Sequence, residues 1–233
     1  MKGDDDMKEI YHPNNVVVIT GSSSGIGRAT AEYFLDRDYE VHGIDKLDAP
    51  DSLTKHSMFH EHKLDIRCVA KYPTIDSVSI LINNAGVQDD HAIEVNLLST
   101  INCTRKYGLQ PTIKSICNLA SVSAHNGAEF DLYTASKGGI LSYTVWTAKE
   151  IAKYGATCNS ISFGGVYTDL NTSVIEDDRS WKEIMDMTPL KKWATPEECA
   201  EWIYFLTAIN QSCTGQDIIV DNGEMRNHKF VWK

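Results

Sequence analysis

A tyrosine and a lysine lie four residues apart in the stretch LYTASKGG, where Tyr133 precedes Lys137. Positions i and i+4 are neighbours on a helix, so a helical conformation places the phenol beside the ammonium. A free tyrosine has a pKa of about 10 and is a weak base near neutral pH, but a nearby ammonium favours the phenolate. The pair could therefore exchange a proton with a substrate oxygen. Taken alone, the spacing is common on helices and is more typical of an ordinary helix with a polar stripe.

A glycine-rich turn, TGSSSGIG, follows a β-branched run and opens a helix. Gly21 can adopt backbone angles that other residues avoid, Gly25 lets the main chain approach a phosphate, and Gly27 lets the helix pack against the strand. The free N–H groups and the dipole of such a helix start favour a pyrophosphate. The spacing G-x-x-x-G-x-G differs by one residue from the usual dinucleotide fingerprint. The turn therefore predicts a dinucleotide site, the alternative being a merely tight turn.

An acid at the end of the second strand bears on the choice of dinucleotide. Asp45 comes 18 residues after Gly27, where a carboxylate can bind both ribose hydroxyls of NAD and repel a 2′-phosphate. The serines of the turn are neutral, and Lys46 is the only nearby cation. These observations favour NAD over NADP, unless Asp45 is only a surface acid.

Strand-like and helix-like segments alternate along the chain and supply the elements that must position these groups. Repeated alternation predicts an α/β fold: a single-domain, Rossmann-type, doubly wound parallel sheet of about seven strands with helices on both faces. Thr195 followed by Pro196 is a strong helix start. We expect a poorly ordered lead-in at residues 1–14, one domain over 15–233 and a substrate lid at about 165–193. The expected strands are 16–20, 39–45, 57–65, 79–83, 114–120, 156–163 and 215–221; the expected long helices are 25–37, 93–110, 133–154 and the one that begins at Thr195.

Composition and charge exclude several classes of function. The 233 residues carry a net charge of −10, which argues against binding to nucleic acid or to anionic membranes. No apolar run approaches the roughly 20 residues of a membrane span, and the start of the chain has no apolar segment typical of a secretory signal. The six cysteines are widely spaced, so no metal site is predicted, and we expect a reducing cytoplasm.

Five motifs in one order resemble the classical short-chain dehydrogenase/reductase family, over about residues 16–223. They are TGSSSGIG, Asp45, NNAG, the strand end NLASVSA, and YTASK. The resemblance implies an NAD-dependent enzyme that interconverts a secondary alcohol and a carbonyl. It implies Tyr133 as the acid/base and Lys137 as the group that lowers the tyrosine pKa and binds the nicotinamide ribose.

The resemblance also implies roles for two further polar residues. Ser121 would hydrogen-bond the substrate oxygen, because it ends a strand where α/β sheets bind ligands; Ser123 is the alternative. Asn96 would hold the active-site backbone and a water that connects Lys137 to solvent. The implied cofactor contacts are Gly21, Ser23, Ser24, Gly25, Ile26, Gly27, Asp45, Asp65, Ile66, Asn83, Ala85, Gly86, Tyr133, Lys137, Gly164, Val166 and Thr168, the last being either a ligand or a turn threonine.

Three segments, 87–95, 122–132 and 165–193, are expected to select the substrate. The sequence departs from the family pattern within or next to them. Only nine residues separate Gly86 from Asn96, which predicts a more open pocket. Phe163 replaces a usual proline, which predicts a looser turn near the nicotinamide. Polar residues before Tyr133 could bind hydroxyls, so we expect a small polar alcohol such as a sugar or polyol; they are His125, Asn126, Glu129 and Asp131.

Other functions remain open at this stage. A 3-oxoacyl-thioester reductase usually prefers NADP and meets an acidic carrier, which Asp45 and the net charge disfavour. A hydroxysteroid dehydrogenase could use the shortened 87–95 segment, and a non-catalytic NAD-binding regulatory protein is the alternative from another class. A homo-oligomer, either a tetramer or a dimer through the helices at about 96–110 and 133–154, is the expected assembly, with the C-terminal tail as a further contact.

Overall fold

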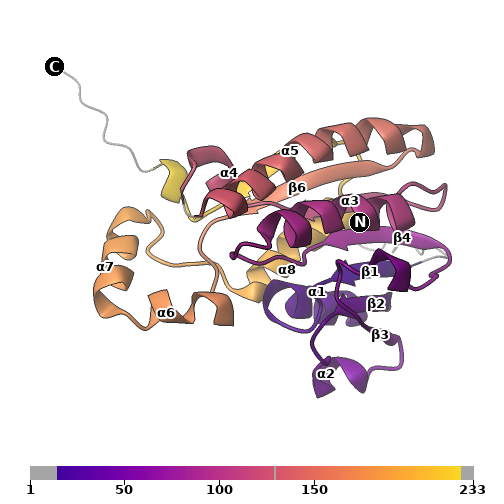
Figure 1. The fold of residues 1–233 in the computed structure, drawn as a ribbon, viewed down its shortest axis with the longest axis horizontal. Coiled ribbons are helices and arrows are strands. Elements are labelled where there is room, and N and C mark those ends of the chain that lie inside the picture. Colours follow the sequence, from indigo (N-terminus) through magenta and orange to yellow (C-terminus); the bar gives the residue numbers. More distant parts are fainter. Residues whose placement is uncertain (1–14, 129, 227–233) are drawn as a thin grey trace, which may run out of the picture.

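A seven-stranded, fully parallel sheet forms the centre of the protein (Figure 1). This computed structural model describes residues 15–128 and 130–226, so the expected lead-in at 1–14 and the end of the C-terminal tail lie outside the described residues. The strand order is β3-β2-β1-β4-β5-β6-β7, as expected for a doubly wound sheet. The strands are β1 (Val16–Thr20), β2 (Glu40–Asp45), β3 (Phe59–Lys63), β4 (Val78–Asn83), β5 (Ser115–Leu119), β6 (Thr157–Phe163) and β7 (Asp217–Val220).

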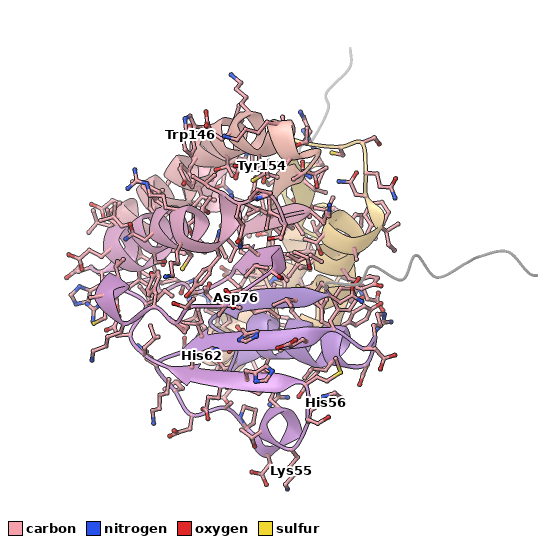
Figure 2. All side chains as sticks on the ribbon, turned by 90° about the vertical axis from the view of Figure 1, so that its right-hand side faces the viewer. Lys55, His56, His62, Asp76, Trp146 and Tyr154 are labelled. Carbon is pink, nitrogen blue, oxygen red and sulfur yellow. The ribbon has the colours of Figure 1, made fainter. Side chains whose placement is uncertain are left out.

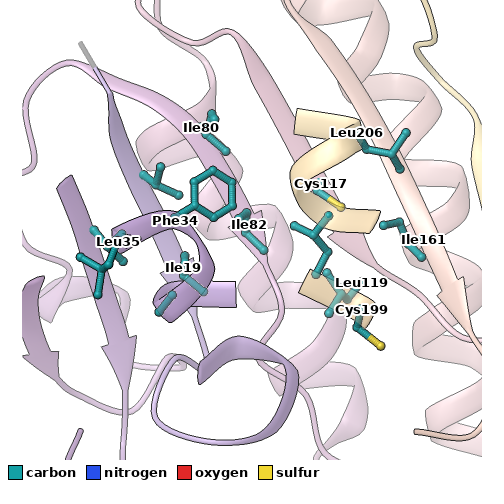
Figure 3. Packing of buried hydrophobic residues seen from close by; sticks show 14 of the residues in the cluster. Ile19, Phe34, Leu35, Ile80, Ile82, Cys117, Leu119, Ile161, Cys199 and Leu206 are labelled. Atoms are coloured by element: carbon teal, nitrogen blue, oxygen red, sulfur yellow. The ribbon is translucent and has the colours of Figure 1, made fainter. Parts of the chain in front are cut away.

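The central strands are apolar on both faces because helices cover both sides of the sheet. Along β1, Val17 and Ile19 belong to one buried cluster and Val18 belongs to the other. This alternation follows from the two-residue repeat of a strand. Figure 3 shows the first cluster, in which Phe34 packs over Ile19 and the neighbouring strands.

Two helices, α1 (Gly25–Leu35) and α8 (Pro196–Tyr204), cover the first face. The predicted start of α8 is confirmed: Thr195 accepts a hydrogen bond from the Glu198 amide, and the Glu198 side chain accepts one from the Thr195 amide. This reciprocal capping satisfies two amides that a helix start leaves unpaired. Near the C-terminal end of α8, Tyr204 packs against Phe34 of α1 with ring centroids 5.2 Å apart.

Two long helical segments cover the second face. The first comprises η2 (Ile93–Leu98), α3 (Ser99–Cys103) and η3 (Thr104–Gly108), and the second is α5 (Asp131–Ile151). Both η2 and η3 are π-helical turns, which the sequence pattern did not indicate. The expected helices are present, and the first turn of α5 contains Tyr133.

The region between β6 and α8 stands apart from the sheet as a group of short helices, drawn in orange in Figure 1. Three aromatic rings hold it, with Trp181 of α7 5.5 Å from Tyr167 and 5.1 Å from Trp193. Among the described helices, none combines the length and apolar character that a membrane span requires. The shorter helices are α2 (Asp51–Thr54), η1 (Val69–Lys71), α4 (Ser123–Asn126), η4 (Ala152–Tyr154), η5 (Asp169–Asn171), α6 (Thr172–Ile175), α7 (Asp178–Met187), η6 (Phe205–Ile209) and η7 (Glu224–Arg226).

Candidate active site

A cavity of about 940 Å³ opens at the carboxyl ends of the strands. Open α/β sheets bind ligands at this edge, because the loops that follow parallel strands meet there. The glycine turn after β1 lines one end, and the start of α5 lines the middle. The segment between β6 and α8, drawn in orange in Figure 1, supplies a further wall through Leu170, Val174 and Ile184.

The phenol and the ammonium of the opening motif both line this cavity. They lie on α5, and the Lys137 Nζ is 5.6 Å from the centroid of the Tyr133 ring. The Lys137 side chain is only 5% exposed, and its Nζ donates a 2.7 Å hydrogen bond to the carbonyl oxygen of Leu119, the last residue of β5. A buried ammonium needs such partners to offset its desolvation. The lysine therefore joins the helix to the strand end that precedes Ser121.

Ser121, and not Ser123, reaches the cavity. The Ser121 Oγ accepts a 3.2 Å hydrogen bond from the Ser123 amide, which orients the hydroxyl. Ser123 begins α4, its side chain is fully buried, and its Oγ has no hydrogen-bond partner. The structure thus places the predicted serine, rather than the alternative, in the cavity that Tyr133 also lines.

Asn96 is fully buried in η2 and does not line the cavity. Its Oδ1 accepts from the Val87 amide at 2.8 Å, and its Nδ2 donates to the Val87 carbonyl at 2.9 Å. The same Nδ2 donates to the Ser136 Oγ at 3.0 Å, and that hydroxyl donates to the Tyr133 carbonyl. Asn96 therefore holds the loop after β4 against the first turn of α5.

The glycine turn has the shape that a pyrophosphate requires. Gly21 and Gly25 have φ values of +69° and +50°, in the left-handed region that favours glycine. A Cβ at Gly27 would lie 1.9 Å from the Gly21 carbonyl oxygen, so only glycine permits this close packing of α1 against the turn. The residues present therefore fit a dinucleotide, with the start of α1 facing the cavity.

Two acids line the cavity near the glycine turn. Asp45 ends β2, and its carboxylate accepts hydrogen bonds from the Ser23 amide at 2.9 Å and from the Leu47 amide at 3.0 Å. These bonds fix the carboxylate beside the glycine turn. Asp65 pairs with Arg67 through contacts of 2.6–3.1 Å, and this guanidinium lowers the pKa of Asp65 to about 2. Asp65 is therefore ionised at neutral pH.

Three predicted cofactor residues do not line the cavity: Ser23, Gly27 and Asn83. Ser23 and Gly27 shape the turn from behind. The prediction for Asn83 is corrected because its side chain is buried between the sheet and η3, where its Nδ2 donates to the Asn118 Oδ1 at 2.8 Å and to the Thr104 Oγ1 at 3.2 Å. The remaining predicted contacts all line it: Gly21, Ser24, Gly25, Ile26, Asp45, Asp65, Ile66, Ala85, Gly86, Tyr133, Lys137, Gly164, Val166 and Thr168.

Two residues that the sequence analysis missed stabilise the turn. Asn84 lines the cavity, and its Nδ2 donates to the carbonyl oxygens of Thr20 at 2.9 Å and Gly21 at 3.0 Å. The Thr20 Oγ1 in turn accepts from the amides of Asn84 and Ala85, both at 3.0 Å. The two asparagines of NNAG have opposite roles because successive side chains point to opposite sides of an extended chain. That alternation is the signal in the sequence that could have found Asn84.

The polar residues expected to bind substrate hydroxyls point elsewhere. The His125 Nε2 lies 2.8 Å from Asp217 and 3.2 Å from Ser162, which ties α4 to the neighbouring strands. Asn126 and Asp131 accept hydrogen bonds from adjacent backbone amides, and none of the three lines the cavity. Glu129 lies outside the described residues. The expectation for His125, Asn126 and Asp131 is therefore wrong.

A different carboxyl faces the substrate end. Glu224 lines the cavity from η7, close to Gly164. Burial, with a further contribution from Asp221, raises the pKa of the Glu224 carboxyl. Trp193 lines the same end, and its ring packs so tightly on Gly165 that a Cβ there would lie 1.9 Å from it. The space beside Gly165 is therefore filled by the indole of Trp193.

A family model described as enoyl-(acyl carrier protein) reductase matches residues 67–224, which span the loop after β3, the Tyr133–Lys137 pair and Glu224. A second model, for the NAD dependent epimerase/dehydratase family, matches residues 17–110. The chain belongs to the short-chain dehydrogenase/reductase family. Members are oxidoreductases that use a nicotinamide dinucleotide, in agreement with the glycine turn and the proton-transfer pair.

Three similar proteins illustrate the range of this dehydrogenase/reductase family. Carbonyl reductase family member 4 of Xenopus laevis is 28% identical, over 90% of this chain and 98% of its own. A 3-oxoacyl-(acyl-carrier-protein) reductase of Chlamydia pneumoniae is 29% identical, over 89% and 95%. The solved structure of a 4-hydroxyisoleucine dehydrogenase complexed with NADH superimposes with a TM-score of 0.81 at 26% identity, over 91% of this chain and 99% of its own.

Replacing Gly27 by Ala is expected to damage the cofactor end of the site. The added Cβ would overlap the Gly21 carbonyl oxygen and approach Asn84 to 2.5 Å, and overpacking of this kind costs about 1–3 kcal/mol. Urea denaturation should show that loss, and fluorescence titration should show weaker dinucleotide binding. Gly138→Ala is the control, because no atom lies within 4 Å of a Cβ placed there. Equal binding by the two variants would contradict the role assigned to Gly27.

Proposed function

We propose that the protein is an NAD-dependent oxidoreductase that interconverts a secondary alcohol and a ketone by hydride transfer, with Tyr133 as acid/base. The observation that carries the proposal is the convergence of Ser121, Tyr133 and Lys137 on the cavity that also contains the glycine turn and Asp45. A proton-transfer group and a dinucleotide cradle in one cavity are what this reaction needs.

In this proposal each residue has one task at a stated atom. The Tyr133 Oη takes the alcohol proton, and the Lys137 ammonium favours the phenolate that accepts it. The Ser121 Oγ donates a hydrogen bond to the substrate oxygen and so orients the reacting carbon. The nicotinamide, when bound, accepts the hydride. Asn96 acts through the backbone, by holding the Val87 loop and the first turn of α5 at a constant separation.

The preference for NAD rests on Asp45. Its carboxylate lines the cavity and is held by two backbone amides, so it cannot easily turn away from a ribose. A 2′-phosphate at this position would meet a like charge. The 4-hydroxyisoleucine dehydrogenase with NADH shows that a similar chain takes the non-phosphorylated cofactor.

The substrate that we propose is a small polar alcohol. Glu224 and Gln88 offer polar groups on the cavity wall, and Trp193 and Leu170 offer apolar ones. A hydroxyl-bearing molecule of modest size would satisfy both kinds of surface. The named substrate of the structural neighbour, 4-hydroxyisoleucine, is of this size and polarity.

A 3-oxoacyl-thioester reductase is the second candidate, because the relative from Chlamydia pneumoniae carries that name. A hydroxysteroid dehydrogenase and a non-catalytic NAD-binding regulatory protein are the remaining alternatives. A panel of polar alcohols with NAD, hydroxysteroids with NAD, and a 3-oxoacyl thioester with NADPH separates them by the absorbance of the reduced cofactor. Binding of NAD without turnover of any member would favour the regulatory role.

Tyr133→Phe is expected to lower kcat by about 100-fold or more, because general acid–base catalysis contributes that much. The variant keeps the ring and loses only the hydroxyl, so NAD binding should remain. Tyr143→Phe on the same helix is the control, since its hydroxyl contacts the Ile101 carbonyl at 3.5 Å and Tyr143 is not among the residues that line the cavity. If both variants turned over the alcohol at the wild-type rate, the acid/base role of Tyr133 would be wrong.

Asp45→Asn is expected to shift the cofactor preference toward NADP, because the substitution removes the charge but not the shape. We expect the ratio of kcat/KM for NADP to that for NAD to rise about tenfold or more, equivalent to about 1.4 kcal/mol. Asp48→Asn is the matched control, as this exposed acid pairs with Lys63 away from the cavity. An unchanged ratio in Asp45→Asn would show that this carboxylate does not recognise the ribose of the cofactor.

Self-association is proposed through the two long helices of the second face. Exposed apolar side chains lie along them: Leu98 on η2, and Leu132, Val145 and Trp146 on α5. Exposed apolar groups in this number on adjacent helices are typical of a subunit contact.

Trp146→Arg is expected to shift the protein to a smaller species in sedimentation velocity. Val69→Arg places the same charge on an exposed valine of η1, outside these helices, and serves as the control. A wild-type protein that sediments as a monomer at all concentrations would refute the proposed contact.

A further inference from the structure

A cluster of histidines occupies the edge of the sheet, on the β2–β3 strand pair and outside the residues that line the cavity. Glu40 and His42 are two residues apart on β2, so their side chains share one face of the sheet. His60 is the register partner of His42 on β3, and His62 follows two residues later on the same face. Figure 2 looks onto this edge, with His62 labelled on the strand.

The distances between the side chains match those between ligands of one metal ion. The Glu40 Oε1 lies 3.2 Å from the His42 Nε2 and 3.0 Å from the His60 Nε2. The three atoms all lie within 4.8 Å of one another. Ligands about 2.0–2.1 Å from a tetrahedral zinc ion are roughly 3.3 Å apart. An ion could therefore enter with small side-chain adjustments.

The fourth member, His62, is placed to orient one of the ligands. Its Nε2 lies 2.9 Å from the His42 Nδ1, and the two rings stack with an interplanar angle of 6°. If the His42 Nδ1–H donates to His62, the lone pair of the His42 Nε2 is directed toward Glu40 and His60. Metal-binding histidines usually donate their second N–H to such a partner.

Burial and charge favour a cation at this position. The His42 side chain is 14% exposed, whereas those of Glu40 and His60 are 42% and 44% exposed, so an ion can reach the cluster from solvent. Among the ion pairs of the described residues, Glu40 has histidine partners and no lysine or arginine.

We propose that Glu40, His42 and His60 bind a divalent transition-metal ion of the zinc class, with His62 as the residue that positions His42. Imidazole and carboxylate ligands suit Zn²⁺, and water would complete the coordination. The ion would join the edge strand β3 to β2. These strands lead to Asp65 and Asp45, the two acids at one end of the cavity, so the bound ion stabilises that end.

The alternative is a metal-free hydrogen-bond network, in which Glu40 simply accepts from two imidazoles. Isothermal titration of the metal-free full chain with ZnCl₂ distinguishes the two. We expect one strong site in the wild type and an affinity at least tenfold lower in Glu40→Gln, which keeps a hydrogen-bonding side chain but removes the carboxylate. His42→Ala and His60→Ala should weaken binding equally. If all three of these variants bound zinc as tightly as the wild type, the proposal would be overturned.

His56→Ala is the matched control, since His56 lies between α2 and β3 and makes only a 3.3 Å local contact through its Nδ1 with the Met58 amide. It should bind zinc like the wild type. His62→Ala should retain a site of reduced affinity, and His62→Gln, which keeps a hydrogen-bond acceptor for the His42 Nδ1–H, should restore part of it.

Two further readouts test the same site. Zinc at 100 times the wild-type dissociation constant should raise the Tm of the wild type by about 5 °C or more, and should raise that of Glu40→Gln by about half as much or less, because the affinity of this variant is at least tenfold lower. Cobalt(II) should give visible d–d bands without a thiolate charge-transfer band, because the proposed ligands include no cysteine. A thiolate band, or an equal rise in Tm for both proteins, would assign the metal to another site.

Discussion

The site depends on the hydrogen bond from the buried Lys137 ammonium to the end of β5. The ammonium donates to the carbonyl oxygen of Leu119, at the last residue of β5, from a position only 5% exposed. A charge in such a position is costly unless it is held by well-placed partners. The bond sets the distance between α5 and the end of β5, so that Tyr133 and Ser121 line the same cavity. The same ammonium that positions these groups is also the charge that favours the phenolate in the proposed reaction.

The loop after β4 connects the two ends of the cavity. At one end, Asn84 donates to the Thr20 and Gly21 carbonyl oxygens and so holds the turn after β1. At the other end, Val87 is held through both its amide and its carbonyl by Asn96, which also reaches the first turn of α5. The loop between Gly86 and Asn96 is short, and this arrangement makes it a rigid bridge. The glycine turn and the first turns of α5, which contain Tyr133 and Lys137, are therefore connected by one hydrogen-bonded loop.

The cavity wall that follows β6 depends on aromatic packing. It is held by the rings of Tyr167, Trp181 and Trp193, and Gly165 is required because the indole of Trp193 lies against it. Trp193 and Glu224 line the same cavity, and the proposed substrate has polar and apolar surface to match them. At the other end of the sheet, the pairing of β2 with β3 brings four side chains of the edge cluster onto one face.

The sequence by itself determined the elements and the class of chemistry. Short strand-like segments between helical ones predicted the seven strands, Thr195 and Pro196 predicted the start of α8, and the i, i+4 spacing placed Tyr133 beside Lys137. Only the tertiary structure decided which side chains face the cavity. Asn83 points into the sheet and Asn84 to the turn, because the phase of a strand at its end depends on its neighbours. His125 of α4 is drawn to Asp217 of β7, and His42 meets His60 through the register of the neighbouring strands β2 and β3. Strand register and packing between distant elements are not encoded in local patterns.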